Sequence, residues 1–177
     1  MSIFTICVAG AESTGKSWLA ARIAAHFGVV AVTEYARAYC ATHGNGLTMA
    51  QLVHVGQVQD SNVRGTVMTS FNVGAPLVVA DTDAIVTSVW AGFSGQPLDP
   101  WFDGDLFESD LYLVMENDLP WEDDGVRIQT EQRQRDRFRT ALTRELDRRK
   151  LRWVGIAGTG EKRFERALSA IGAHRRG

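Results

Sequence analysis

Short apolar runs recur along the chain and are separated by longer segments of mixed polarity. The runs cover residues 3–9, 29–32, 77–80, 111–115 and 153–156, and turn-forming residues bound them. A strand that is buried on both faces of a parallel sheet loses the alternation of apolar and polar residues and reads as such a continuous run. The pattern therefore predicts a parallel sheet of five strands.

The segments between these runs repeat their apolar residues with helical spacing. We expect helices over residues 16–27, 48–70, 82–93, 130–150 and 161–171. The fourth places Phe138, Leu142 and Leu146 four residues apart on an otherwise charged helix. Strands that alternate with helices indicate a three-layer α/β fold with right-handed crossovers. Residues 92–104 are the most loop-like stretch, but they mark no boundary, and we expect one domain over residues 1–177.

A glycine-rich loop joins the first predicted strand to the first predicted helix. It matches the pattern G-x-x-x-x-G-K-[ST] at every position, from Gly10 to Ser17. The glycines allow a tight turn whose backbone N–H groups point at phosphate oxygens, and the helix N-terminus adds a partial positive charge. In this arrangement Lys16 reaches the β- and γ-phosphates and the Ser17 hydroxyl ligates Mg²⁺. The loop predicts a nucleotide site that includes Gly10, Ser13, Thr14, Gly15, Lys16 and Ser17.

The residue after this loop is Trp18, where many such loops carry Thr or Ser. Tryptophan has no hydroxyl for the α-phosphate, so its backbone N–H would make that contact, or the indole would serve in packing. A phosphate loop identifies a nucleotide but no reaction. The guanine-reading pattern N-K-x-D is absent, because neither Lys150 nor Lys162 follows an Asn. Its absence argues against a Ras-like GTPase.

Carboxylates follow two of the predicted strands. Asp81 and Asp83 come directly after the run 77–80, and ligands of open α/β sheets bind beyond the carboxyl ends of the strands. We expect Asp81 to hold Mg²⁺ and the other acid to accept a proton from a substrate hydroxyl. The structural alternative is that this segment caps the next helix.

The second strand end carries Glu34 and Arg37, which are three residues apart and can share one side of a helix's first turn. A substrate site is favoured over an isolated salt bridge, with Glu34 accepting from hydroxyls and Arg37 binding an anionic group.

An arginine-rich segment follows the fourth run. Phosphoryl transfer needs cations over the oxygens of the transferred group, and a closing segment excludes water. We therefore expect a lid over about residues 117–137. Arg127 and Arg133 lie nearest the nucleotide in this interpretation, whereas Arg148 and Arg149 are expected to be solvated.

Charge is distributed unevenly along the 177 residues, although the formal net charge is −2. Residues 1–126 hold four basic and fifteen acidic residues, and residues 127–177 hold fifteen basic and six acidic ones. Such an asymmetry indicates a basic tail for an anionic partner or a basic element that folds over an anionic ligand. The small net charge argues against a strong nucleic-acid or membrane-surface binder.

The two cysteines, Cys7 and Cys40, indicate neither a disulfide framework nor a zinc site. The N-terminal apolar segment runs directly into the glycine-rich loop, so we interpret it as a buried strand rather than a signal peptide. No apolar run approaches the ~20 residues that a membrane-spanning helix needs. We expect a cytoplasmic protein.

Four motifs in this order resemble the kinase domain of the NadR family, nicotinamide riboside kinases that are similar in fold to nucleoside monophosphate kinases. They are the phosphate loop at 10–17, Glu-Tyr-Ala-Arg at 34–37, Asp-Thr-Asp at 81–83 and Asp-x-Pro-Trp-x-x-Asp-Gly-x-Arg at 118–127. Residues 156–158 and Arg163 are similar to the family's closing strand and adenine-side loop. The resemblance covers nearly the whole chain and implies a nucleoside-monophosphate-kinase-like P-loop fold with a lid.

The resemblance also implies a reaction, in which ATP with Mg²⁺ phosphorylates the 5′-hydroxyl of nicotinamide riboside to nicotinamide mononucleotide. It implies catalytic roles for Lys16, Glu34, Asp81, Asp83 and Arg127, metal contacts from Ser17 and Asp81, and nucleotide contacts from Trp18, Arg133, Gly158 and Arg163. The flat, cationic nicotinamide ring suits aromatic faces and carboxylates. The candidate substrate residues are Glu34, Tyr35, Arg37, Tyr39, Asp83, Trp90, Trp121 and Asp124.

Two other functions stay open at this point. A kinase for another nucleoside or small alcohol would share the phosphate machinery, and a nucleotide-binding regulatory module would share the loop without the transfer. The motifs decide neither which carboxylate is the base, nor ATP against GTP, nor the oligomeric state. In each case the expected partner is a small molecule rather than nucleic acid or membrane.

Overall fold

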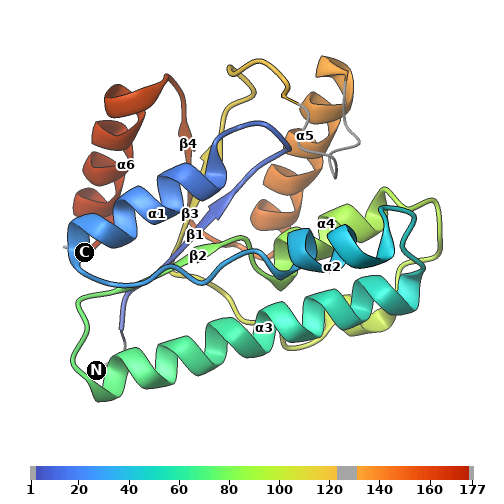
Figure 1. Cartoon of the computed structure of the whole chain (residues 1–177), viewed down its shortest axis with the longest axis horizontal. Helices are drawn as coiled ribbons and strands as arrows, with labels where there is room; N and C mark the ends of the chain where they lie inside the picture. The colour runs from blue at the N-terminus through green and yellow to red at the C-terminus, as the bar shows by residue number, and fades with distance from the viewer. Residues whose placement is uncertain (1–2, 123–130, 176–177) are drawn as a thin grey trace.

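A parallel sheet forms the centre of the computed structural model, which describes residues 3–122 and 131–175 (Figure 1). Its strands in this part of the chain are β1 (Thr5–Ala9), β2 (Val78–Asp81), β3 (Leu111–Met115) and β4 (Trp153–Ile156), in the order β2-β1-β3-β4. Every residue of the first three strands is buried, which is why these segments read as continuous apolar runs. The predicted α/β fold with a parallel sheet is confirmed.

The prediction of a fifth strand is wrong for the described residues. Residues 29–32 run beside β2 but join it at one point, the bridge between Val32 and Ala80. The N–H of Val29 is used at the end of the preceding helix, and Val30 is 86% exposed. Because the centre of this apolar run points into solvent, the run pairs with the sheet through this one bridge.

Six α-helices and a short 3₁₀-helix (Pro100–Asp103) connect the strands within the described residues. The helices are α1 (Lys16–Phe27), α2 (Tyr35–His43), α3 (Met49–Asn72), α4 (Ala84–Gly92), α5 (Gln132–Arg148) and α6 (Gly160–Arg175). The sequence predicts five of them, and the sixth, α2, buries none of its side chains and so has no apolar periodicity. Within the described ranges no helix combines the length and the apolar character that crossing a membrane requires.

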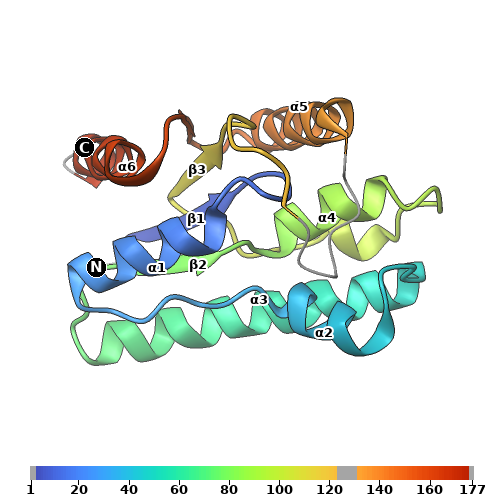
Figure 2. The ribbon, with the colours of Figure 1, turned by 45° about the horizontal axis from the view of Figure 1, so that its top comes forward.

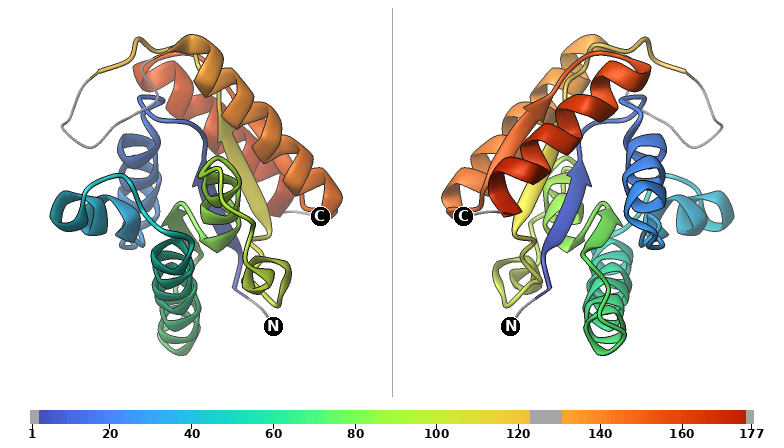
Figure 3. Two further views of the ribbon diagram at one scale, coloured as in Figure 1. Left: turned by 90° about the vertical axis from the view of Figure 1, so that its right-hand side faces the viewer. Right: turned by 90° about the vertical axis from the view of Figure 1, so that its left-hand side faces the viewer.

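The helices form two layers around the sheet. Helices α1 and α6 pack on one face, and α4 and α5 pack on the other (Figure 2). Helix α3 packs beside β2, on the opposite side of the molecule from α5 and α6 (Figure 3). On α5 the predicted apolar residues Phe138, Leu142 and Leu146 are fully buried, and they fix this helix against the sheet.

The two distal arginines of the α5 region behave differently from the expectation that both are solvated. The Arg149 side chain is 9% exposed, and its Nη2 donates a 2.6 Å hydrogen bond to the carbonyl of Phe102. Arg148 is more exposed and forms ion pairs with Glu145 and Asp103. The expectation is therefore wrong for Arg149, because its guanidinium ties the segment after α4 to the end of α5.

Candidate functional site

The phosphate loop lies between the carboxyl end of β1 and the start of α1. Gly10 has a φ of 150°, and a Cβ at this position would lie 2.9 Å from the Cβ of Met115. Gly15 has a φ of 78° and is the N-cap of α1. Residues with a side chain rarely adopt these φ values, so both positions require glycine. The two glycines allow the backbone of the loop to turn tightly.

Lys16 is the first residue of α1, and its side chain folds back over the loop. Its Nζ donates a 2.9 Å hydrogen bond to the carbonyl of Ala11, which also accepts a 2.8 Å bond from the hydroxyl of Thr14. A neutral carbonyl is a weaker partner for an ammonium group than a phosphate oxygen. The side chain is therefore held where it can exchange this partner for a phosphate.

A cavity of about 700 Å³ opens from the phosphate loop. Cavities of this size are typical of sites for small molecules and cofactors. Part of its wall is apolar and consists of Leu47, Leu52, Val55, Val86, Trp90 and Phe93. Its charged wall residues are Glu12, Lys16, Glu34, Arg37 and Arg137. One cavity thus has a phosphate-binding end and a partly apolar wall, and positively and negatively charged side chains also line it.

Glu34 and Arg37 face this cavity from the start of α2. Their closest atoms, Nε of Arg37 and Oε2 of Glu34, are 3.9 Å apart, and the Glu34 side chain is 18% exposed. Burial raises the pKa of the Glu34 carboxyl, and Lys16 is the main group that lowers it. Asp81 raises this pKa further, which places its charge near Glu34. A carboxylate with a raised pKa in a cavity is suited to accept a proton from a hydroxyl.

Asp81 ends strand β2 and is buried beside β1, opposite Val8. Its Oδ1 is buried and has no hydrogen-bond partner within the described residues. Such an atom is unfavourable unless a cation or donor joins it, and carboxylate and hydroxyl oxygens are ligands that Mg²⁺ prefers. The hydroxyl-bearing Ser17 lines the cavity. The residues present therefore fit Mg²⁺, although the described residues hold no group of three or more His, Cys, Asp or Glu that would bind a metal by themselves.

The position of Asp83 differs from the predicted one, in which its side chain contacts the substrate. It is 1% exposed and is the N-cap of α4, where its Oδ1 accepts a 2.9 Å bond from the N–H of Val86. Its Oδ2 accepts a 2.7 Å bond from the hydroxyl of Tyr112. Burial raises the pKa of Asp83, and the Tyr112 hydrogen bond opposes that shift. Both oxygens are engaged inside the protein and the side chain does not line the cavity, so Asp83 is a buried helix cap.

Tyr35 and Tyr39 also lie apart from the predicted substrate position. The ring of Tyr39 stacks on His43 with centroids 4.0 Å apart, and the Tyr35 hydroxyl lies 3.4 Å from Nε2 of His54. These rings form an aromatic cluster between α2 and α3. Neither tyrosine lines the cavity. Their aromatic faces are used to attach α2 to α3.

The three candidate tryptophans have three different surroundings. Trp90 lines the cavity and packs on Phe138 with ring centroids 4.2 Å apart. Trp18 lines the cavity and is 46% exposed, so its indole is not a core residue. Trp121 is half-buried, and its indole N–H meets no acceptor among the described residues. Trp18 and Trp90 are thus the indoles that a bound molecule can reach in the cavity.

Arg163 is buried beneath the phosphate loop rather than free to bind a nucleotide. It is 1% exposed, and its guanidinium donates to the carbonyl of Thr14 and to Oδ1 of Asp118. The other oxygen of Asp118 accepts a 2.6 Å bond from the N–H of Gly158. Arg163 and Gly158 therefore differ from the prediction, because Nη1 and Nη2 of Arg163 and the N–H of Gly158 join the phosphate loop to the ends of β3 and β4.

The segment after β3 packs on the phosphate loop. The Ser13 hydroxyl accepts a 3.0 Å bond from the N–H of Glu122 and donates a 3.2 Å bond to its carbonyl. The predicted lid thus begins in contact with the loop. Two of its candidate residues, Asp124 and Arg127, lie outside the described residues.

Among the described lid arginines, the predicted Arg133 is exposed on the first turn of α5 and does not line the cavity. Arg137, one helical turn later, does line it. Arg133 and Arg137 share one face of α5, so the arginine that lines the cavity lies one helical turn beyond the position that the prediction chose.

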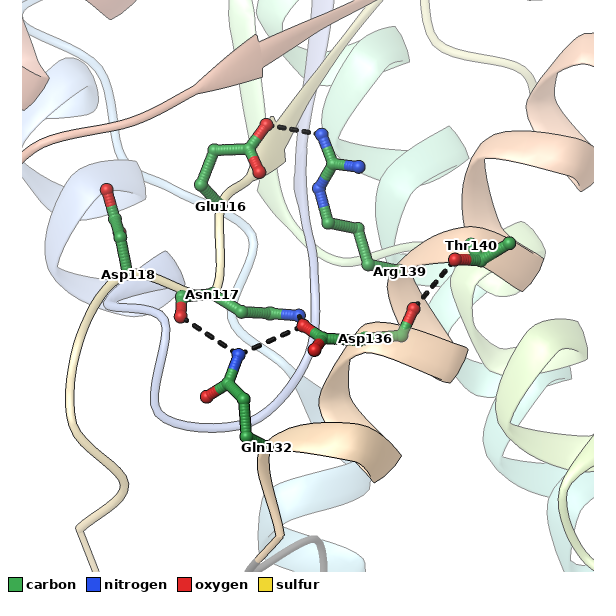
Figure 4. A pocket seen from close by; sticks show the side chains of 7 residues that line it. All are labelled: Glu116, Asn117, Asp118, Gln132, Asp136, Arg139 and Thr140. Atoms are coloured by element: carbon green, nitrogen blue, oxygen red, sulfur yellow. Dashed lines mark hydrogen bonds and ion pairs between the residues drawn. The ribbon is translucent and has the colours of Figure 1, made fainter.

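A second hollow of about 390 Å³ lies between the end of β3 and the start of α5 (Figure 4). Glu116, Asn117, Asp118, Gln132, Asp136, Arg139 and Thr140 line it. Its polar groups largely bond one another: Arg139 pairs with Glu116, and Gln132 donates to Asp136 and to the carbonyl of Asn117. These contacts fasten the first turns of α5 to the sheet.

Part of the cavity wall was not predicted from the sequence. Leu52 and Val55 are spaced helically along α3, and both line the cavity. The missed signal is Gln59, which continues that spacing four residues after Val55 and is 1% exposed. A buried amide on an apolar helix face indicates a specific polar partner.

Comparison with known proteins identifies relatives over most of the chain. Residues 5–163 match the AAA_28 family, described as an AAA domain. The trifunctional NAD biosynthesis/regulator protein NadR of Escherichia coli (strain K12) is 25% identical over 171 residues. The protein of the same name from Salmonella typhimurium (strain LT2) is 26% identical over 178 residues. Each comparison covers 94% of this chain and 42% of the relative, so the chain spans less than half the length of these curated relatives.

Solved structures are similar as well. A crystal structure of NadR protein in complex with NR has a TM-score of 0.80 and 27% identity, over 97% of this chain and 51% of that chain. NadR protein in complex with NAD and AMP-PNP has a TM-score of 0.77 and 26% identity, over 97% and 49%. Thymidylate kinase from Ehrlichia chaffeensis, at 15% identity and a TM-score of 0.65, covers 98% of this chain and 99% of that one and shares the fold. With a family match over most of its length and this structural likeness, the chain belongs to the AAA_28 family as a P-loop domain homologous to NadR.

Proposed function

We propose that this domain is an ATP-dependent kinase that phosphorylates the 5′-hydroxyl of nicotinamide riboside and releases nicotinamide mononucleotide. The observation that carries the proposal is the single cavity in which Lys16 and Ser17 of the phosphate loop meet Glu34, Arg37 and an apolar chamber. The similarity to NadR structures that contain NR or AMP-PNP supports the choice of substrate and nucleotide.

The nucleotide end of the cavity is built by the phosphate loop. Its backbone N–H groups and the N-terminus of α1 suit the β-phosphate, and Lys16 exchanges the Ala11 carbonyl for phosphate oxygens. Ser17 and Asp81 would hold Mg²⁺, since the Asp81 carboxylate has a buried oxygen without a partner. Bound there, the metal would neutralise charge on the phosphates.

At the substrate end of the cavity we propose Glu34 as the proton acceptor. The 5′-oxygen attacks the γ-phosphorus, the bond from that phosphorus to the β-phosphate oxygen breaks, and the hydroxyl proton passes to Glu34. We choose Glu34 over Asp83 because Glu34 lines the cavity while both oxygens of Asp83 are engaged elsewhere. The apolar wall with Trp90 suits the face of the nicotinamide ring, and Glu12 adds a negative charge for that cation.

Arg137 is the described arginine that we propose to stabilise the transferred group, because it lines the cavity from α5. Arg127 stays a prediction of the sequence. A closing segment after β3 stays a prediction too, with Ser13 and Glu122 as its described contact with the loop.

An ADP-release assay with a panel of nucleosides tests the function. We expect release with ATP, Mg²⁺ and nicotinamide riboside, and a product with the mass of nicotinamide mononucleotide. GTP in place of ATP tests the choice of nucleotide. Lys16→Ala removes the ammonium and should abolish turnover while the circular-dichroism spectrum stays unchanged.

Each alternative has its own result in this assay. ADP release with another nucleoside or small alcohol, but none above buffer with nicotinamide riboside, would overturn the substrate. Nucleotide binding without ADP release in any reaction would instead indicate a regulatory module. Turnover retained by Lys16→Ala would remove the phosphate loop from the mechanism.

A further inference from the structure

Gln59 is the buried polar residue of α3 on the face that turns toward the sheet. Val55, Gly56 and Val63 are the other buried residues of this helix, and Gln59 is 1% exposed among them. An amide that is taken out of water without hydrogen bonds destabilises the folded protein. Its presence on an apolar face therefore needs a specific use.

The Gln59 amide bonds the backbone of two separate segments. Its Oε1 accepts a 2.9 Å hydrogen bond from the N–H of Tyr35, and its Nε2 donates a 3.0 Å bond to the carbonyl of Thr82. The orientation of the amide follows from its partners, because an N–H only donates and a carbonyl only accepts. Glu34 immediately precedes Tyr35, and Asp81 immediately precedes Thr82.

Both bonded groups need an external partner. The N–H of Tyr35 is the first of α2, and the side chain of Glu34 at the N-cap makes no capping bond. Thr82 has a φ of 66°, a left-handed conformation that is unfavourable for residues other than glycine. Gln59 supplies the missing cap from another helix and a fixed partner for the strained turn after β2.

We propose that Gln59 is a positioning residue that sets the distance between the Glu34 and Asp81 carboxylates by holding the backbone next to each. This inference rests on the proposed function, in which Glu34 takes the proton and Asp81 binds the metal. The aromatic cluster holds the rings of Tyr35 and Tyr39 against α3, whereas the Gln59 bond fixes the backbone N–H directly after Glu34.

The expected effect follows from that geometry. Misplacing a reacting group by about 1 Å costs on the order of 100-fold in rate. We therefore expect loss of the Gln59 amide to lower kcat about 10- to 100-fold. The KM for ATP should change less than kcat, because Gln59 contacts no residue of the phosphate loop in the hydrogen bonds of the structure and acts on the metal site only through the backbone next to Asp81.

Two variants and a matched control test the proposal. Gln59→Met keeps the length of the side chain and removes both hydrogen bonds, whereas Gln59→Glu keeps the acceptor for Tyr35 and loses the donor to Thr82. The control is Gln57→Met, the same change on an exposed position of the same helix. We expect kcat to fall in both Gln59 variants, with a shifted pH profile of kcat, and to stay within twofold of the wild type in the control.

A purely structural role gives a different result. In that case the melting temperature and the fraction of nucleotide-binding protein fall, but kcat per binding-competent molecule and the pH profile stay at the wild-type values, which would overturn the proposal. If Gln59→Met does not fold, Gln59→Glu decides by the same criteria.

A measurement without turnover separates this inference from the proposed function. If the wild type phosphorylates none of the panel, the proposed function has failed. The position of Glu34 is then followed by NMR titration of its side-chain carboxyl in wild type, Gln59→Met and Gln57→Met, because neither variant adds a charge that would shift the midpoint by itself. A titration midpoint that moves only in the Gln59 variant supports the positioning role, and an unchanged midpoint refutes it.

Discussion

The contact between Asp118 and Arg163 makes a prediction whose size follows from burial. Asp118→Asn removes the carboxylate charge beside a guanidinium that is 1% exposed, while leaving the side-chain size nearly unchanged. Breaking a buried ion pair by removing one partner destabilises a protein by about 3–5 kcal/mol, because the remaining charge is uncompensated. The Asp118 side chain is 34% exposed, so water reaches one end of the pair and the lower limit applies.

We therefore expect the free energy of unfolding of Asp118→Asn to fall by about 3 kcal/mol. For a domain of this size that corresponds to a decrease in melting temperature of roughly 6–12 °C. The assay is thermal unfolding by circular dichroism at neutral pH. Asp105→Asn is the control, since the Asp105 side chain is fully exposed and lies 3.9 Å from Arg64. This control should shift the melting temperature by no more than about 2 °C.

A matched change on the cation tests the physical cause. The double variant Asp118→Asn/Arg163→Met removes both charges, and an apolar replacement of a buried ion pair is tolerated better than a pair broken by the loss of one partner. The double variant should therefore be less destabilised than Asp118→Asn alone. A melting temperature of Asp118→Asn equal to that of Asp105→Asn would refute the claim that the buried guanidinium depends on this carboxylate.

Three further predictions concern the cavity and its support. Glu34→Gln should lower kcat at neutral pH yet raise the melting temperature there. Folding raises the pKa of the Glu34 carboxyl, so its ionised form costs stability as pH rises through that pKa. The gain in stability of the variant should therefore vanish below about pH 4 in a melting series. Asp83→Ala removes a helix cap and the acceptor of the Tyr112 hydroxyl, and urea unfolding should show a loss of about 2–4 kcal/mol without a change in KM. Phe138→Ala should cost about 3–5 kcal/mol in the same assay and raise the KM for the nucleoside, because the ring supports Trp90.

The fold was predictable where an element buries its own residues. The run 111–115 coincides with β3, and the helix expected over 16–27 coincides with α1. The run 29–32 has the same apolar composition, but solvent takes the place of a partner strand along it. The composition of a segment shows that it is apolar. The number of backbone hydrogen bonds that it makes to the sheet depends on which segment lies beside it.

The site was predictable where chemistry is local in sequence. The loop from Gly10 to Lys16 builds its geometry from consecutive residues, so its motif suffices. Asp81 and Asp83 are predicted together at the site, as metal ligand and proton acceptor, yet one has a buried oxygen without a partner and the other caps a helix. Gln59 acts through backbone groups that are 24 and 23 residues away, a relation that no motif encodes.

Helix α2 contributes Glu34 and Arg37 to the cavity although none of its side chains is buried. A segment with so little buried surface separates from the rest of the protein at a small part of the global unfolding free energy, so its amide protons exchange with solvent through local opening. A molecule that binds only the docked helix has its observed affinity reduced by the undocked fraction. The same molecule slows amide exchange in α2 when it binds, which gives each candidate substrate a signature that can be read before any phosphoryl group is transferred.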